Sequence, residues 1–234
     1  MDIIPFIRFT LNSRYISRWL YEGLMIYIPI LNFFSLGYLS KVSRLLMIGG
    51  IGLPPWQDKQ DLNVRINFIF VFNKSTWIEG VKLIFIFILY EAVPFFLFSS
   101  GFFLTTLSNI TAFFGYIIIK LSYIALFICS FLLPFAFATF ADQMDLRKAL
   151  EFEKILKGIK EVFIPYLGGY LGTLIALYIC KLIMHIPYLI GFILSSILTY
   201  YVFLISTYYF TELFKKTTLP TEITGEDMTK SSEQ

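Results

Sequence analysis

Two opposite charges inside apolar segments are the residues of this chain that could do chemistry. Glu91 precedes an uncharged stretch around Thr105, and Lys120 follows it at a similar distance. Because a helix rises by about 1.5 Å per residue, the two side chains would reach similar depths in an antiparallel hairpin. An unpaired charge inside a membrane costs several kcal/mol, so we expect an ion pair. The pair could fix the register of the two helices, or it could gate a path for protons or solutes.

No other set of residues predicts catalysis. His185 is the only histidine, and Cys129 and Cys180 lie in separate apolar runs. A zinc site needs several such ligands together, and a catalytic nucleophile needs a base beside it. The sequence also lacks the glycine-rich phosphate-binding motifs and the HExxH metalloprotease motif. We therefore expect no enzymatic activity, no catalytic residue, no metal and no cofactor.

The composition places the charged pair in a lipid bilayer. Of the 234 residues, 57% are apolar and 15% are charged, whereas soluble domains have about 45–50% and about 25%. The mean hydropathy is +0.74. This leaves too little polar surface for a soluble domain, and a net charge of +3 does not supply the basic face that nucleic acid requires. The composition predicts an integral membrane protein with no nucleic-acid partner.

Four segments are apolar and long enough to cross a bilayer, which requires about 20 residues in a helix. They cover residues 77–100, 111–133, 162–184 and 188–210. We expect an all-α, polytopic bundle in which these four transmembrane helices form two hairpins, within a single membrane domain over residues 1–214.

A further apolar run over residues 20–39 is interrupted by Glu22, Pro29 and Asn32. Arginines precede this run and a basic stretch follows it, so a full crossing would leave one basic group outside the cell. A re-entrant hairpin broken at Pro29 would keep both groups on one side. The alternative is a fifth span with the N-terminus outside.

Basic residues predict the orientation of the chain. They gather in the connections 41–76 and 142–161 and, after the last span, at Lys215 and Lys216. The positive-inside rule puts these stretches in the cytoplasm and makes the chain a multi-pass protein of the cell membrane. The connection 142–161 has the periodicity of an amphipathic helix, which could be a plain connector or a docking surface. The polar tail, 215–234, is expected to be disordered and cytoplasmic.

Small residues recur at intervals of four on the last two spans. They are Gly168, Gly172 and Ala176 on one span and Ser195 and Thr199 on the other. Small side chains let helices approach closely in a membrane. The ladder predicts a packing seam within this hairpin, or a seam with a membrane-protein partner or a second copy of the chain.

Several short motifs carry a family resemblance. Gly37 and Tyr38 precede a basic stretch, and Leu53, Pro54 and Trp56 follow it. Two further blocks are 80–82 (Gly-Val-Lys) and 145–150 (Asp-Leu-Arg-Lys-Ala-Leu). Over about residues 20–210 the chain resembles the uncharacterised prokaryotic membrane family known as domain of unknown function 4013. That family has no established activity, so the resemblance implies a multi-span fold and supplies no catalytic residues.

These observations favour a non-enzymatic scaffold or accessory subunit of a membrane assembly. The alternative is a small permease or channel-like transporter that uses Glu91 and Lys120, and an intramembrane enzyme comes third. A transporter would have a water-accessible cavity reaching Glu91, whereas an accessory subunit would have the charged pair sealed by packing.

Overall fold

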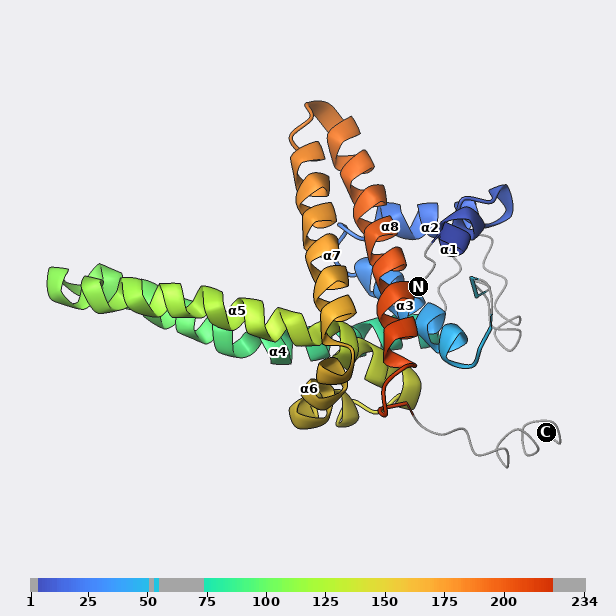
Figure 1. Cartoon of the computed structure of the whole chain (residues 1–234). Coiled ribbons are helices and arrows are strands. Elements are labelled where there is room, and N and C mark those ends of the chain that lie inside the picture. Colours follow the sequence, from blue (N-terminus) through green and yellow to red (C-terminus); the bar gives the residue numbers. More distant parts are fainter. Residues whose placement is uncertain (1–3, 51–52, 55–73, 221–234) are drawn as a thin grey trace.

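The structure is a computed structural model that describes residues 4–50, 53–54 and 74–220 of the chain. These residues form helices and no strands, as the sequence predicts (Figure 1). In chain order the elements are α1 (Ile4–Thr10), α2 (Ser13–Met25), α3 (Asn32–Met47), α4 (Lys74–Leu107), α5 (Asn109–Gln143), the 3₁₀ turn η2 (Lys148–Leu150), α6 (Phe152–Glu161), α7 (Phe163–Ile183) and α8 (Tyr188–Phe214).

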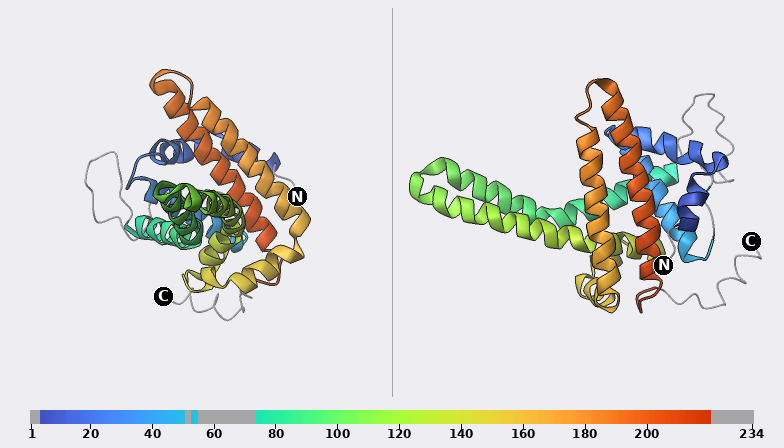
Figure 2. Two further views of the ribbon diagram at one scale, coloured as in Figure 1. Left: turned by 90° about the vertical axis from the view of Figure 1, so that its left-hand side faces the viewer. Right: turned by 45° about the horizontal axis from the view of Figure 1, so that its top comes forward.

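Four of these helices, α4, α5, α7 and α8, are long and apolar enough to cross a membrane. They form two hairpins, which confirms the predicted number of spans and their pairing (Figure 1). The hairpins leave a common base in clearly different directions (Figure 2). The α4/α5 hairpin projects far from the rest of the chain, and the N-terminal helices pack beside α8.

The α4/α5 hairpin turns at a single residue, Ser108. Its hydroxyl accepts a hydrogen bond from the amide of Thr111, and the hydroxyl of Thr111 accepts one from the amide of Ser108. This reciprocal cap starts α5 sharply. Near the turn, a Cβ atom added to Gly101 would lie 2.9 Å from the main-chain oxygen of Gly115. The absence of side chains at these two glycines therefore lets α4 and α5 touch.

The apolar run over residues 20–39 is divided between two helices. The chain turns between α2 and α3 over residues 26–31. This turn contains Pro29, and Ile30 takes a positive φ of 73°. The break expected at Pro29 is therefore present, and no continuous helix covers this run as a fifth span. Tyr27 in the turn bonds to α8 through the hydroxyls of Ser195, at 3.1 Å, and Thr199, at 2.7 Å.

Helix α3 lies at the centre of the base and contacts α2, α4, α5 and α8. It crosses α4 at two glycines. A Cβ atom on Gly37 would lie 1.8 Å from the main-chain oxygen of Thr76, and one on Gly80 would lie 1.7 Å from that of Phe33. The two helix backbones are thus in direct contact, at a separation that any larger residue would prevent.

The basic connection after α5 is not one continuous amphipathic helix. It consists of a turn at Met144, which has a positive φ of 54°, then η2 and the shorter helix α6. Ile155 and Ile159 of α6 face the core, while Phe152 and Leu156 are exposed. The left-handed residue ends α5 and reverses the chain, which the periodicity of the sequence did not reveal.

The ordered chain continues past the expected boundary at residue 214. Thr218 donates from its amide and its hydroxyl to the carboxylate of Glu161, at 2.9 and 2.7 Å. Leu219 lies over Gly158 of α6, where a Cβ atom would leave it no room. Thr218 and Leu219 therefore bind to α6, and the part of the predicted disordered tail after residue 220 lies outside the described residues.

The crossing of α3 and α4 gives a direct test. Replacing Gly37 or Gly80 with alanine would force the two backbones apart, and overpacking of this kind costs about 1–3 kcal/mol or more. We expect Gly37→Ala to lower the thermal unfolding temperature in detergent. Gly168→Ala is the matched control, because a Cβ atom at Gly168 meets nothing within 4 Å. Equal unfolding temperatures for the two variants would contradict the described crossing.

Candidate functional site

An ion pair between a partly exposed arginine and a buried carboxylate lies beside the crossing of α3 and α4. Nη2 of Arg44 lies 3.0 Å from Oε2 of Glu79, whose side chain is only 6% exposed. The guanidinium of Arg44 also contacts the sulfur of Met144. A carboxylate buried this deeply requires a cation nearby to remain ionised. The pair therefore joins α3 and α4, and the contact with Met144 extends the connection to the end of α5.

The residues of the first family motif belong to the same junction. Gly37 makes the helix crossing, and the hydroxyl of the neighbouring Tyr38 donates to the main-chain oxygen of Pro54 at 2.9 Å. Leu53 is buried in the apolar cluster that also contains Tyr38. Trp56 lies outside the described residues. The described part of the motif therefore holds the chain that follows α3 against α3 itself.

The motif block at residues 145–150 fixes the connection after α5. Oδ1 of Asp145 accepts from the amide of Arg147 at 2.9 Å, which closes the turn. Ala149 is fully buried, and its main-chain oxygen accepts from the hydroxyl of Tyr90 on α4 at 2.8 Å. Tyr166 on α7 donates to the main-chain oxygen of Phe131 on α5. The contacts of Asp145 and Ala149 give this motif block a structural role.

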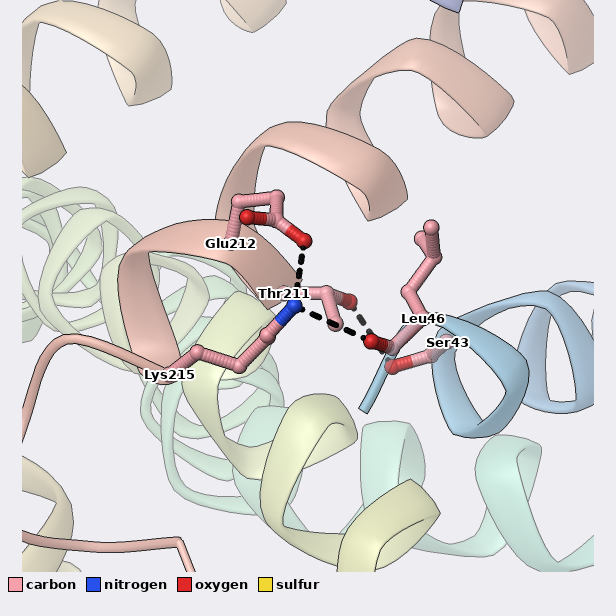
Figure 3. A network of polar contacts seen from close by, with 5 residues as sticks. All are labelled: Ser43, Leu46, Thr211, Glu212 and Lys215. Atoms are coloured by element: carbon pink, nitrogen blue, oxygen red, sulfur yellow. Dashed lines mark hydrogen bonds and ion pairs between the residues drawn. The ribbon is translucent and has the colours of Figure 1, made fainter. Parts of the chain in front are cut away.

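A polar network ties α3 to α8 at their C-terminal ends (Figure 3). Oγ of Ser43 and Oγ1 of Thr211 are 2.8 Å apart. Nζ of Lys215 donates to the main-chain oxygen of Leu46 at 3.1 Å and to the carboxylate of Glu212 at 2.8 Å (Figure 3). A lysine at this position satisfies a carbonyl in the last turn of a helix. Lys215, expected only as a cytoplasmic basic residue, thus also caps α3.

The structure does not bring Glu91 and Lys120 together. The side chain of Lys120 is exposed, and no ion pair joins it to Glu91 in the part of the chain that the structure describes. Glu91 instead has Cys129 and Tyr170 as electrostatic neighbours. The hairpin turns at Ser108 rather than near Thr105, so the register differs from the expected one.

The small-residue ladder is placed differently from the seam expected within the hairpin. Gly168 and Gly172 face open space, and Ala176 is half-buried. Helix α7 instead meets α8 at Gly169, which lies against the ring of Tyr209. The other two members, Ser195 and Thr199, bond to Tyr27, and Ser195 also donates to the main-chain oxygen of Cys180.

Further packing between α7 and α8 comes from Thr173, whose hydroxyl is 2.9 Å from that of Ser206. The side of α7 that faces α8 therefore carries Gly169 and Thr173, each one residue after the predicted positions Gly168 and Gly172. The alternative, a seam with a partner or a second copy, remains a prediction.

The described residues contain no group of three or more His, Cys, Asp and Glu side chains that could hold a metal. His185 is exposed at the α7/α8 turn, where its Nδ1 lies 3.0 Å from the main-chain oxygen of Lys181. Glu79 is not among the residues for which the sequence predicts a role. Its position directly before Gly80 was the available signal, but its partner, Arg44, lies far away in the chain.

The ion pair between Arg44 and Glu79 can be tested by neutralising one partner. Arg44→Met would leave the buried Glu79 carboxylate without its cation. Because the Arg44 side chain is 37% exposed, we expect a cost between the about 1 kcal/mol of a surface pair and the about 3–5 kcal/mol of a fully buried one. Glu151→Gln is the matched control, since its pairs with Lys148 and Lys154 lie at the surface and surface pairs contribute about 0–1 kcal/mol. We expect a large fall in thermal stability for Arg44→Met and little change for the control. Equal effects would refute the assignment.

Comparison with known proteins identifies a family but no activity. No curated protein and no solved structure matches the chain. One family model, described as "Protein of unknown function (DUF4013)", matches residues 23–205. This range includes the α3/α4 junction, both hairpins as far as residue 205, and the connection after α5. The chain therefore belongs to the DUF4013 family of proteins of unknown function.

Proposed function

We propose that this protein is a non-enzymatic scaffold or accessory subunit of a membrane assembly, and that the α4/α5 hairpin is its contact arm. The observation that carries this proposal is the exposure of the arm. Away from the base, α4 and α5 touch mainly each other. Their outward side chains are large and apolar, for example Phe96, which is 71% exposed, and Phe103, which is 62% exposed.

The distribution of polar contacts supports this proposal. The ion pair and the motif contacts gather at the base, where they hold α3, α4 and the end of α5 together. Such a base suits a protein that must present a long hairpin at a fixed angle. Large exposed apolar surfaces mark contacts with other proteins or with lipid. A partner of the arm would therefore be another membrane protein or a second copy.

The orientation of the chain is part of the proposal. The basic residues of α6 and of the connection before it lie at the base, as does the C-terminal end of α8. By the positive-inside rule, the base would face the cytoplasm and both hairpins would cross the cell membrane from that side.

A small permease or channel-like protein is the alternative function, and an intramembrane enzyme is the third. The permease hypothesis relied on a charged pair formed by Glu91 and Lys120. Because these two side chains are not joined in the described chain, no specific observation now favours transport over assembly.

The contact arm can be tested by photo-crosslinking in native membranes. We would place a photoreactive amino acid at Phe96 or Phe103 on the arm and, as the matched control, at Ile175, which is 62% exposed on α7. We expect a discrete protein adduct from the arm positions, because a partner covers them, and lipid adducts from the control. Mass spectrometry of the adduct would identify the partner. Lipid adducts alone from every arm position would contradict the proposed function.

A further inference from the structure

A second polar junction joins α2, α3 and α8, separate from the crossing of α3 and α4. At this junction Gly23 of α2 lies against α8, where an added Cβ atom would be 3.0 Å from the Cα atom of Ile197. The hydroxyl of Ser196 donates to the main-chain oxygen of Gly23. From α3, Oγ of Ser35 donates to the main-chain oxygen of Glu22 at 2.8 Å. Helices α2, α3 and α8 therefore meet at the main chain of Glu22 and Gly23.

Two buried polar side chains meet here, each with an oxygen atom that has no hydrogen-bond partner. Glu22 is 3% exposed and Tyr200 is fully buried. Neither Oε2 of Glu22 nor the hydroxyl of Tyr200 has a hydrogen-bond partner, and the two groups interact electrostatically. Around them lies an apolar cluster that includes Trp19, Ile26 and Leu204. Unpartnered buried polar groups are rare in folded proteins and call for an explanation.

The charges around Glu22 do not favour a carboxylate. From α3 the ionisable neighbour of this junction is the phenol of Tyr38, and from α8 it is the phenol of Tyr200. Arg44 on α3 is paired with Glu79, and no ion pair joins a described lysine or arginine to Glu22. Arg8 on α1 is exposed. Among the described side chains none supplies a cation to this carboxylate, and burial removes it from water, which is strongly unfavourable for a charged group.

We infer that Glu22 and Tyr200 form a buried proton-binding site that holds α2 against α3 and α8, and that loss of the proton releases α2. The ligand is a proton taken from water by the carboxylate of Glu22. When the pH rises, the same proton returns to water and a buried carboxylate remains. This site is independent of the proposed contact arm on α4 and α5.

The sign of the pH dependence follows from burial. Desolvation raises the pKa of Glu22 from 4.5 to about 7, and the Ser35 hydroxyl lowers it only in part. The folded junction therefore binds the proton more tightly than a released α2 would. Its stabilising effect is complete below pH 4.5 and is lost as the pH rises through about 7. Over that range the ratio of released to docked α2 would increase by up to roughly 300-fold.

Infrared spectroscopy of the full-length protein in lipid vesicles tests this inference. The membrane-embedded Glu91 is first removed by Glu91→Gln, so that its carboxyl group does not contribute. We expect the carbonyl band of a protonated carboxylic acid at neutral pH, and we expect it to disappear in the additional variant Glu22→Gln. Tyr200→Phe should shift the frequency of the band, because it removes the neighbouring hydroxyl. A neutral-pH spectrum that Glu22→Gln leaves unchanged would overturn the inference.

Hydrogen exchange along α2 measures the release itself and does not require a variant. In the unmutated protein, protection of the α2 amides should fall as the pH rises through about 7, after correction for the intrinsic exchange rate. In Glu22→Gln the protection should no longer depend on pH, since an amide side chain cannot ionise. Protection of α2 that is independent of pH in the unmutated protein would also overturn the inference.

Discussion

The direct contact between the backbones of α3 and α4 is the constraint on which the rest of the structure depends. Gly37 and Gly80 bring the two helices so close that neither position has room for a Cβ atom. This approach brings Arg44 within 3.0 Å of Glu79. Because α4 continues into the long hairpin while α3 also packs on α8, one crossing sets the directions of both hairpins.

This arrangement separates the roles of polar and apolar residues. Polar contacts tie the base together, at the Arg44–Glu79 pair, at Ser43 with Thr211, and at Tyr90 with Ala149. Beyond the base, the α4/α5 hairpin relies on close helix packing, such as that between Gly101 and Gly115. Inside a membrane this division is expected, because lipid does not drive apolar helices together and small residues permit closer contact.

The sequence was sufficient to predict the features of the fold that depend on local composition. Length and hydropathy predicted α4, α5, α7 and α8, and Pro29 predicted the break before α3. The sequence did not predict which face of each helix packs against its neighbour. A neighbouring residue in a helix points about 100° away, so the packing position at Gly169 points away from the predicted one at Gly168.

Contacts between distant parts of the chain left no readable local signal. Nothing near Gly37 indicates that Gly80 is its partner, and Glu79 is one charge among the 16 acidic residues. Glu22 looked like an interruption of an apolar run, but it is one of the most deeply buried carboxyl groups among the described residues. Similarly, the position of the turn at Ser108 decided which residues face Glu91, and a shift of three residues from Thr105 was enough to separate it from Lys120.

The separation between the tips of the two hairpins would show whether the crossing of α3 and α4 sets their directions. Spin labels at Thr106 and His185, both exposed at the turns, would report this distance by pulsed electron resonance in lipid nanodiscs. We expect a single, long and narrowly distributed distance that broadens when Gly80→Ala disturbs the crossing. A short distance typical of two parallel hairpins packed side by side, or a distribution unaffected by Gly80→Ala, would contradict it.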